Sequence, residues 1–349
     1  MSAERRILVA LSGGVDSAVA AGLLAEQGHA LVGVFMRNGV AGAAAERSCC
    51  SLSDARDARA VADRLGIPFY VADLERPFAR LIAGFASDYA RGLTPNPCVV
   101  CNQELKFGEL LALAGDLGCD SVATGHYARL EDGRLRRGVD AGKDQSYLLA
   151  GLTPAQLAGA RLPLGGLLKT RVRAEAARLR LPVADKPDSA EICFVPGGDY
   201  RAVVAERAGG LGARGRLVDE TGATLGAHAG VAGFTVGQRR GLGLAAAQPL
   251  YVTAIDPDSG DVTVGPREAL RRDTCRVGAV VWQQRATDGP VAVQLRHHHR
   301  AEPARLEPDG HGGLTVRFEQ PSAAVTPGQY AAFYDGDLVL GAGRVLREA

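Results

Sequence analysis

Apolar and polar residues follow two alternating patterns in the first third of the chain. Short continuous apolar runs predict buried strands, at residues 5–11, 30–36, 67–73 and 121–124. The segments between them have apolar residues at helical spacing and predict helices, at residues 16–27, 53–65, 75–91 and 103–117. Because strands and helices alternate, we expect an α/β fold with a parallel sheet covered on both faces. A ligand would then bind beyond the carboxyl ends of the strands.

The pattern changes after residue 196. Residues 196–268 are rich in glycine, with short strand-like pieces such as 249–255. From about residue 274, short β-type segments separated by turn residues predict a small barrel, with strands at 276–282, 291–295, 314–318, 329–334 and 338–340. We therefore predict a parallel-sheet domain at 1–195, a small central domain at 196–268 and a C-terminal β-barrel at 269–349.

Three local signals refine this picture. The residues Glu131–Gly133 are typical of a hairpin turn. A helix is expected at 172–181, ended by Pro182. The small, glycine-rich stretch 39–48 predicts a mobile loop.

The composition indicates the class of protein but does not indicate what the protein binds. The chain has 349 residues, of which 46% are hydrophobic and 23% charged, as in ordinary globular proteins. No apolar run reaches membrane-spanning length, the N-terminus lacks the pattern of a signal peptide, and seven unevenly spaced cysteines do not resemble a secreted disulfide framework. We therefore expect a cytoplasmic protein.

The formal net charge is only +1, so any nucleic-acid contact must come from local basic patches. Each patch could equally be a solvated face. The candidates are Arg134, Arg136 and Arg137; Lys169, Arg171 and Arg173; Arg239 and Arg240; and 296–300.

The segment Ser12-Gly-Gly-Val-Asp-Ser17 is the strongest chemical signal, because it lies between a predicted strand and a predicted helix. Such a turn directs backbone N–H groups and the positive helix end toward one point, which suits an oxyanion. Asp16 would be out of place beside a phosphate unless it holds a magnesium ion. The spacing differs from both the P-loop and the dinucleotide fingerprint. It resembles the PP-loop of the ATP pyrophosphatase superfamily.

Six further motifs follow in order, and together they resemble the tRNA-specific 2-thiouridylase family (MnmA/TrmU). They are Thr94–Asn102, Ala123–Tyr127, Lys143–Tyr147, Asp188–Phe194, Gly237–Gly243 and Thr326–Gln329. The resemblance covers the chain from about residue 5 to its end. It implies a sulfurtransferase that adenylates the C2 oxygen of the wobble uridine and replaces it with sulfur.

The resemblance also implies an ATP site. It makes 1–195 the ATP-binding catalytic domain and assigns the nucleotide contacts, with Mg²⁺ on Asp16, to Ala10, Leu11, Ser12, Gly13, Gly14, Val15, Asp16, Ser17, Met36 and Gly125.

The sulfur step requires a sulfur nucleophile, which cysteine chemistry or a metal–sulfide can supply. Cys119 and Cys275 begin apolar strands and are expected in the core, and no role is assigned to Cys49 and Cys50. In the family, the residue at Cys193 carries a persulfide from a cysteine desulfurase or sulfur-carrier protein. The residue at Cys101 releases the sulfur and forms a disulfide with it.

Cys98 makes a second route possible. One branch of the family has Asp at this position, whereas Cys98, Cys101 and Cys193 together resemble the branch with a [4Fe-4S] cluster. We favour the cluster here and keep the persulfide route as the alternative.

The resemblance assigns tRNA-contacting residues to the first and last predicted domains, and it makes 196–268 a linker domain that also contacts tRNA. A wobble base is single-stranded and can be flipped into a pocket, so a near-neutral protein can reach it. His126 has a competing interpretation as a structural histidine. The expected contacts are Asn96, Pro97, Cys98, His126, Lys143, Asp144, Gln145, Arg296, His297 and Gln329.

Two alternative functions remain open from the sequence. Another PP-loop ligase would use ammonia or an amine and would not need the three cysteines. A non-catalytic iron–sulfur or RNA-binding protein would not need an intact PP-loop.

Overall fold

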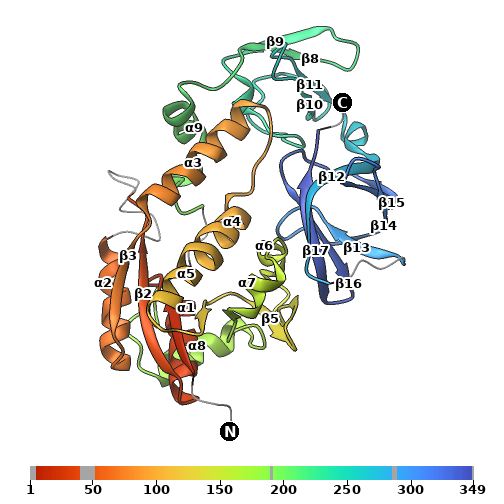
Figure 1. Ribbon diagram of the computed structural model, residues 1–349. Helices are drawn as coiled ribbons and strands as arrows, with labels where there is room; N and C mark the ends of the chain where they lie inside the picture. Colours follow the sequence, from red (N-terminus) through yellow and green to blue (C-terminus); the bar gives the residue numbers. More distant parts are fainter. Residues whose placement is uncertain (1–4, 40–51, 189–191, 285–288, 348–349) are drawn as a thin grey trace. The chain divides into compact units, whose positions relative to one another are not determined.

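The computed structural model describes residues 5–39, 52–188, 192–284 and 289–347 (Figure 1). These residues form two compact units, one from 1–81, 98–198 and 337–339 and the other from 82–97, 199–336 and 340–349. The predicted loop at 39–48, together with Cys49 and Cys50, lies outside the described residues except for Gly39. No helix among the residues described is long and apolar enough to cross a membrane.

The first unit is built on a five-stranded sheet of order β3-β2-β1-β4-β7. Neighbouring strands are parallel. They are β1 (Arg6–Ala10), β2 (Ala30–Arg37), β3 (Phe69–Asp73), β4 (Ser121–Ala123) and β7 (Ala160–Arg161). Ile7, Leu8 and Val9 are fully buried in the central strand β1, as expected of a strand covered on both faces. The predicted parallel sheet is confirmed.

Helices α1 (Val15–Glu26), α2 (Leu52–Leu65) and α8 (Lys169–Arg178) pack with β1 and β2 in one apolar core. Helix α1 ends in a Schellman motif at Gly28, whose φ of +80° suits glycine. The Gly28 N–H bonds to the Ala25 carbonyl, and the His29 N–H bonds to the Leu24 carbonyl. This motif turns the chain directly into β2.

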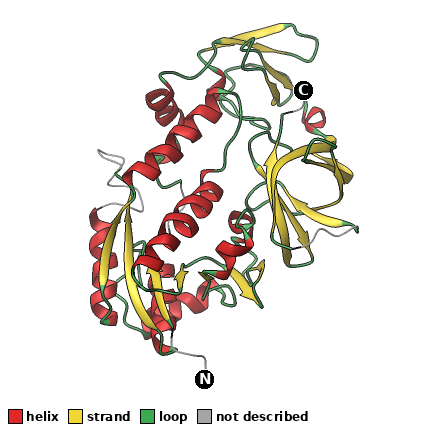
Figure 2. Cartoon of the chain, viewed as in Figure 1, coloured by secondary structure: helices red, strands yellow, loops and turns green. Residues whose placement is uncertain are grey.

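Figure 2 draws the remaining helices of this unit in red with the others. They are α3 (Glu75–Ala90), α4 (Pro97–Val100), a π-helix (Cys101–Glu109), α5 (Leu110–Asp116), α6 (Ser146–Leu149) and α7 (Pro154–Ala158). One of them, α3, is shared between the two units, which divide after residue 81. The hairpin β5 (Ala128–Glu131) and β6 (Arg134–Arg137) turns at Asp132 and Gly133, which confirms the predicted turn.

The second unit holds helix α9 (Tyr200–Ala208), a four-stranded sheet of order β10-β11-β8-β9 and a barrel. The sheet contains β8 (Gly215–Val218), β9 (Thr224–His228), β10 (Tyr251–Ile255) and β11 (Val262–Gly265). The barrel runs β12-β15-β14-β13-β16-β17 and closes by pairing β12 with β17. Its strands are β12 (Arg272–Trp282), β13 (Val291–Gln294), β14 (Glu302–Pro308), β15 (Leu314–Ser322), β16 (Tyr330–Asp335) and β17 (Leu338–Val345). The predicted barrel is confirmed, and the exact domain borders stay predictions.

Two predicted helices begin earlier than expected. Helix α8 begins at Lys169, because Asp140 accepts a hydrogen bond from the Lys169 backbone N–H at 2.9 Å. It ends at Arg178 because Arg180 adopts φ +53°, so the helix stops before Pro182 acts. The helix expected from 103 begins at Pro97, whose missing N–H is tolerated at a first helical position.

Candidate active site

The loop between β1 and α1 is held in shape by its own side chains. The Ser12 N–H donates to Ser17 Oγ at 3.1 Å, and Ser17 Oγ donates to the Gly14 carbonyl at 3.1 Å. Gly14 is the N-cap of α1 and offers no side-chain cap, so the first N–H groups of the helix are not capped by that residue. These N–H groups and the positive helix end therefore suit an anion, as the sequence predicts.

Gly13 is required twice over. Its φ is +73°, and a Cβ there would lie 2.4 Å from the Asp54 carbonyl oxygen at the start of α2. Gly28 shares the positive φ, but an added Cβ would have no atom within 4 Å. Substitution of Gly28 should therefore cost only the strain of the left-handed backbone, whereas substitution of Gly13 should add a steric clash.

Gly13→Ala is expected to unfold more easily than wild type and to lose nucleotide binding. Gly28→Ala is the matched control: it should lose only about 1–2 kcal/mol of unfolding free energy, the cost of the left-handed backbone, and keep its nucleotide affinity. Urea unfolding and calorimetric titration with Mg·ATP measure both effects. Wild-type affinity in Gly13→Ala would contradict the prediction.

The three predicted nucleotide-binding segments converge at one edge of the sheet. Ala10 pairs with Val34, so half-buried Met36 at the carboxyl end of β2 lies beside the loop after β1. Gly125 follows β4, the neighbour of β1 on the other side. A Cβ on Gly125 would lie 2.7 Å from the Ser17 nitrogen and 2.7 Å from the Asp16 carbonyl carbon, so only glycine fits here.

Asp16 is fixed through a single carboxylate oxygen. Its Oδ1 accepts hydrogen bonds from Tyr127 Oη at 2.7 Å and from Lys169 Nζ at 2.7 Å. Burial raises the pKa of the Tyr127 hydroxyl, and its hydrogen bond to Asp16 raises that pKa further, so the hydroxyl remains a donor. Within the part of the chain that the structure describes, Oδ2 of Asp16 has no such partner and could hold a metal ion.

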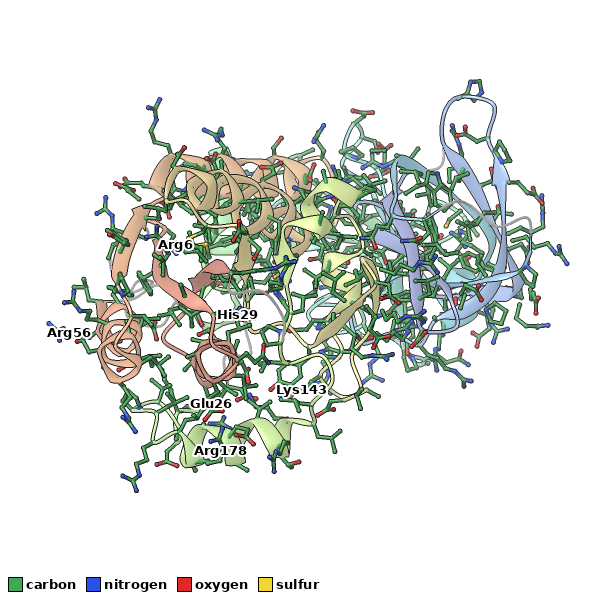
Figure 3. The ribbon with its side chains drawn as sticks, turned by 60° about the horizontal axis from the view of Figure 1, so that its bottom comes forward. Arg6, Glu26, His29, Arg56, Lys143 and Arg178 are labelled. Carbon is green, nitrogen blue, oxygen red and sulfur yellow. The ribbon has the colours of Figure 1, made fainter. Side chains whose placement is uncertain are left out.

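Asp188 forms ion pairs with three basic side chains near this loop. It pairs with Lys169 Nζ at 2.9 Å, with Lys143 Nζ at 2.8 Å and with Arg173 Nη2 at 2.5 Å. Burial raises the pKa of Asp188, but hydrogen bonds from Lys143 and Lys169 lower it by more, so its pKa lies well below the usual range. Lys143 lies on the side of this unit shown in Figure 3.

Lys186 holds the loop from another direction. Its Nζ lies 3.0 Å from the Gly13 carbonyl oxygen, 2.6 Å from Asp54 and 2.5 Å from Asp57. Burial lowers the pKa of Lys186, but the hydrogen bonds to the two carboxylates raise it by more. This lysine ties the start of α2 to the anion-binding loop.

Cys98 and Cys101 lie on the helical segment that begins at Pro97, rather than before a helix as predicted. Their spacing of three places them on neighbouring positions of one helix side. Cys101 begins a π-helix, in which the Leu110 N–H bonds to the carbonyl of Leu105, five residues back. Cys98, Cys101 and Cys193 are all partly exposed, whereas Cys119 and Cys275 are buried core residues, as predicted.

The described part of the structure contains no set of ligands for the predicted iron–sulfur cluster. Among the residues described, no three His, Cys, Asp or Glu side chains come together so that they could hold a metal ion. Cys98, Cys101 and Cys193 therefore do not fit a cluster as they stand, and we derive no step through one.

The predicted tRNA-contacting residues of the first unit differ in how far their side chains are buried or already hydrogen-bonded within the protein. His126 is buried and lies 2.7 Å from Thr124 Oγ1, and burial, followed by the charge of Lys106, lowers its pKa well below the usual value. Asp144 accepts hydrogen bonds from Gly138, Ser146 and Arg137, and Gln145 accepts one from the Tyr127 N–H. Only Lys143, 41% exposed, offers a charged group to solvent among these four.

The predicted contacts of the second unit form two groups. Gln329 donates to the carbonyls of Thr94 and Pro95 and lies 3.5 Å from Asn96, directly before Pro97. Arg296 donates to the Val236 carbonyl and to Thr326, and the His297 ring lies 3.8 Å from the His298 ring, centroid to centroid, at a tilt of 40°. Roles in tRNA binding stay predictions for all of them.

Sequence reasoning missed the residues that organise the loop. Tyr127 and Asp188 lie within motifs that it singled out, and Lys169 appeared only as part of a surface basic patch. The structure instead buries most of Lys169, whose side chain is 14% exposed. Lys169 is the first residue of α8, and its backbone N–H bonds to Asp140. Nothing in the sequence around it indicates that its side chain pairs with Asp16.

Three family models match successive parts of the chain and together cover most of it. Residues 5–197 match the family model "tRNA methyl transferase HUP domain", 206–266 its PRC-barrel domain and 272–345 the "Aminomethyltransferase beta-barrel domain".

Relatives of nearly full length match as well. A tRNA-specific 2-thiouridylase MnmA of Rhodospirillum centenum is 48% identical over 99% of this chain and 92% of the relative. The enzymes of that name from Geotalea uraniireducens and Mycolicibacterium paratuberculosis are 46% and 50% identical, each over 97% of this chain and over 94% and 98% of their own lengths. The chain therefore belongs to the tRNA-specific 2-thiouridylase (MnmA) family.

Proposed function

We propose that this protein is an ATP-dependent tRNA-uridine 2-sulfurtransferase that thiolates the wobble uridine of tRNA anticodons. The observation that carries the proposal is the anion-binding loop at residues 12–17, joined by Met36 and Gly125 at one sheet edge, in a chain whose full-length relatives are named for this activity. Among the described cysteines, Cys119 and Cys275 are buried in the core, and the partly exposed Cys98, Cys101 and Cys193 remain for sulfur chemistry.

ATP is the expected first substrate. Its phosphates would meet the N–H groups at the start of α1, and its adenine would lie against the main chain of Met36. The free Oδ2 of Asp16 would hold Mg²⁺, which supplies charge neutralisation for the phosphates. Tyr127 and Lys169 would keep this carboxylate oriented through its other oxygen.

The first chemical step would activate the base. The C2 oxygen of uridine attacks the α-phosphorus of ATP, the bond from that phosphorus to the β-phosphate oxygen breaks, and pyrophosphate leaves. Oxygen on C2 is otherwise a poor leaving group, and the bound AMP makes it a good one. Backbone N–H groups of residues 12–17 would stabilise the charge that develops on the phosphates.

The second step would exchange oxygen for sulfur. The terminal sulfur of a Cys193 persulfide attacks C2, and AMP leaves with the oxygen. Cys101 then attacks the inner sulfur, so that 2-thiouridine is released and a Cys101–Cys193 disulfide forms. A thiol reductant must reduce that disulfide, and a persulfide donor must then transfer its outer sulfur to the Cys193 thiolate and leave as a thiol, before the next turnover. We prefer this route because the described side chains do not fit a cluster.

Incubation with unmodified tRNA, Mg·ATP and a persulfide donor tests the proposal. Nucleoside mass analysis should detect 2-thiouridine, and AMP with pyrophosphate should accumulate in step with it. Release of ADP and phosphate would exclude the assignment. Ligation of ammonia or an amine without thiolation would identify a different PP-loop enzyme.

tRNA binding should depend on salt only moderately, because the net charge of +1 implies few phosphate contacts. Lys143→Ala is expected to lower the slope of log affinity against log salt by about one. Filter binding from low to physiological salt measures it, with ATP affinity as the control. An equal loss of ATP and tRNA affinity would show that Lys143 supports the fold through Asp188 instead.

A further inference from the structure

Two ammonium groups lie against the anion-binding loop, and they differ in how many acceptors they already have. An ammonium has three N–H donors. Lys186 meets three acceptors, the Gly13 carbonyl and the carboxylates of Asp54 and Asp57. Its donors are therefore used up in holding the loop.

Among the residues that the structure describes, Lys169 meets two acceptors. Its Nζ lies 2.7 Å from Asp16 Oδ1 and 2.9 Å from Asp188 Oδ1, and no third protein acceptor occurs among the described residues. The ammonium also lies 5.7 Å from the ring centroid of Tyr127, whose hydroxyl bonds to the same oxygen of Asp16. One N–H of a largely buried cation is thus available directly beside the residue that is expected to hold Mg²⁺.

The position of Lys169 is set by two helices that run side by side. Asp16 is in the first turn of α1, and Lys169 is the first residue of α8, whose backbone N–H is fixed by Asp140. The last residues of the same helices, Glu26 and Arg178, form a second ion pair (Figure 3). Helices α1 and α8 therefore begin at the same end, and their start brings the ammonium to the loop.

We propose that Lys169 is a nucleotide-binding residue: its third N–H donates to a phosphate oxygen of ATP while the other two hold Asp16 and Asp188. No rearrangement is needed, because Asp16 keeps Oδ2 for Mg²⁺ while Oδ1 stays with Lys169 and Tyr127. The anionic phosphate supplies the third acceptor that the described residues do not provide. The inference deepens the proposed function and rests on ATP binding at this loop.

The test is equilibrium binding of three probes, Mg·ATP, ATP in excess chelator and adenosine, measured by calorimetry without tRNA. Lys169→Ala should weaken Mg·ATP and metal-free ATP by about 10- to 100-fold each, the range of a hydrogen bond between charged groups. Adenosine affinity should change by less than about twofold, because the nucleoside has no phosphate. Lys169→Arg, which keeps charge and donors, should recover part of the loss.

Arg178→Ala is the matched control. It removes one positive charge and one ion pair between the same two helices, at the end remote from the loop. Its affinity for Mg·ATP should stay within about twofold of wild type, because its partner Glu26 is exposed and its other partner, the buried Glu175, keeps its ion pair with Arg171. If Lys169→Ala does not fold, Lys169→Met, which keeps the side-chain length, replaces it.

Three results would overturn the inference. Lys169→Ala could bind both forms of ATP as tightly as wild type. It could lose Mg·ATP alone, which would mean that Lys169 acts only by orienting Asp16. It could lose adenosine equally, which would mean a structural role. If wild-type protein fails to bind Mg·ATP at all, the proposed function fails instead, so the two failures are distinguishable.

Discussion

Cys193→Ser is expected to abolish tRNA thiolation, with activity falling by at least about a thousandfold, because a hydroxyl cannot carry or transfer the persulfide sulfur. Adenylation should survive: the variant should still release pyrophosphate with substrate tRNA, since the anion-binding loop is untouched. Cys101→Ser should stop at a later stage, with sulfur bound but not released. Nucleoside mass analysis and a pyrophosphate assay on the same samples separate these outcomes.

Cys98→Ser is the discriminating comparison. Cys98 lies three residues before Cys101 on the same helical segment and is also partly exposed. The persulfide route assigns it no bond-forming step, so this variant should keep most of its activity in metal-free protein. If anaerobically purified protein contains roughly four irons per chain, as for one cubane cluster, and all three serine variants lose iron and activity together, the persulfide route is wrong.

The general architecture could be predicted from the sequence because it rests on local pattern. Buried runs such as Ile7–Val9 identified the central strand, and the glycines of the loop marked the strand-to-helix turn. Strand β14 was missed because its sequence, Glu302–Pro308, contains two prolines and two glutamates and no apolar run. Its place in the barrel comes from pairing with β13 and β15.

The site was predicted less completely than the fold, because its organising contacts join residues far apart in sequence. Asp16 and Lys169 are 153 positions apart, and Gly13 and Lys186 are 173 apart. The basic run at Lys169–Arg173 suggested a solvated face or an RNA contact. Its first member is instead mostly buried against Asp16, while Arg171 pairs with Glu175 and Arg173 with Asp188. Local spacing contains no information on such pairs.

For the cysteines, the sequence predicted burial but not the chemistry. The sequence alone correctly separated core from partly exposed cysteines, although Cys119 lies just before β4 and Cys275 lies inside β12 rather than at the start of a strand. It could not decide between a cluster and a persulfide, because the choice depends on how residues on separate segments converge.

Asp16→Ala is expected to abolish formation of AMP and pyrophosphate, by at least about a thousandfold, since it removes both the proposed Mg²⁺ ligand and the anchor of Tyr127 and Lys169. Loss of this shared acceptor should also lower the free energy of unfolding, by about 1–3 kcal/mol for the partly buried donors it leaves unpaired. The alanine variant alone therefore cannot separate the loss of metal binding from the loss of the contacts that hold Tyr127 and Lys169.

Asp16→Asn separates the two effects. The amide oxygen can take the place of Oδ1 and accept from Tyr127 and Lys169, while the amide nitrogen, which cannot bind a cation, takes the place of Oδ2. This variant should unfold close to wild type in urea, yet lose the Mg²⁺ dependence of ATP binding and nearly all pyrophosphate release. Because metal-free ATP needs no carboxylate, its affinity should stay level or rise as the negative charge disappears. Full activity in Asp16→Asn at ordinary Mg²⁺ would show that the metal is held elsewhere and that Asp16 serves only to position Tyr127 and Lys169.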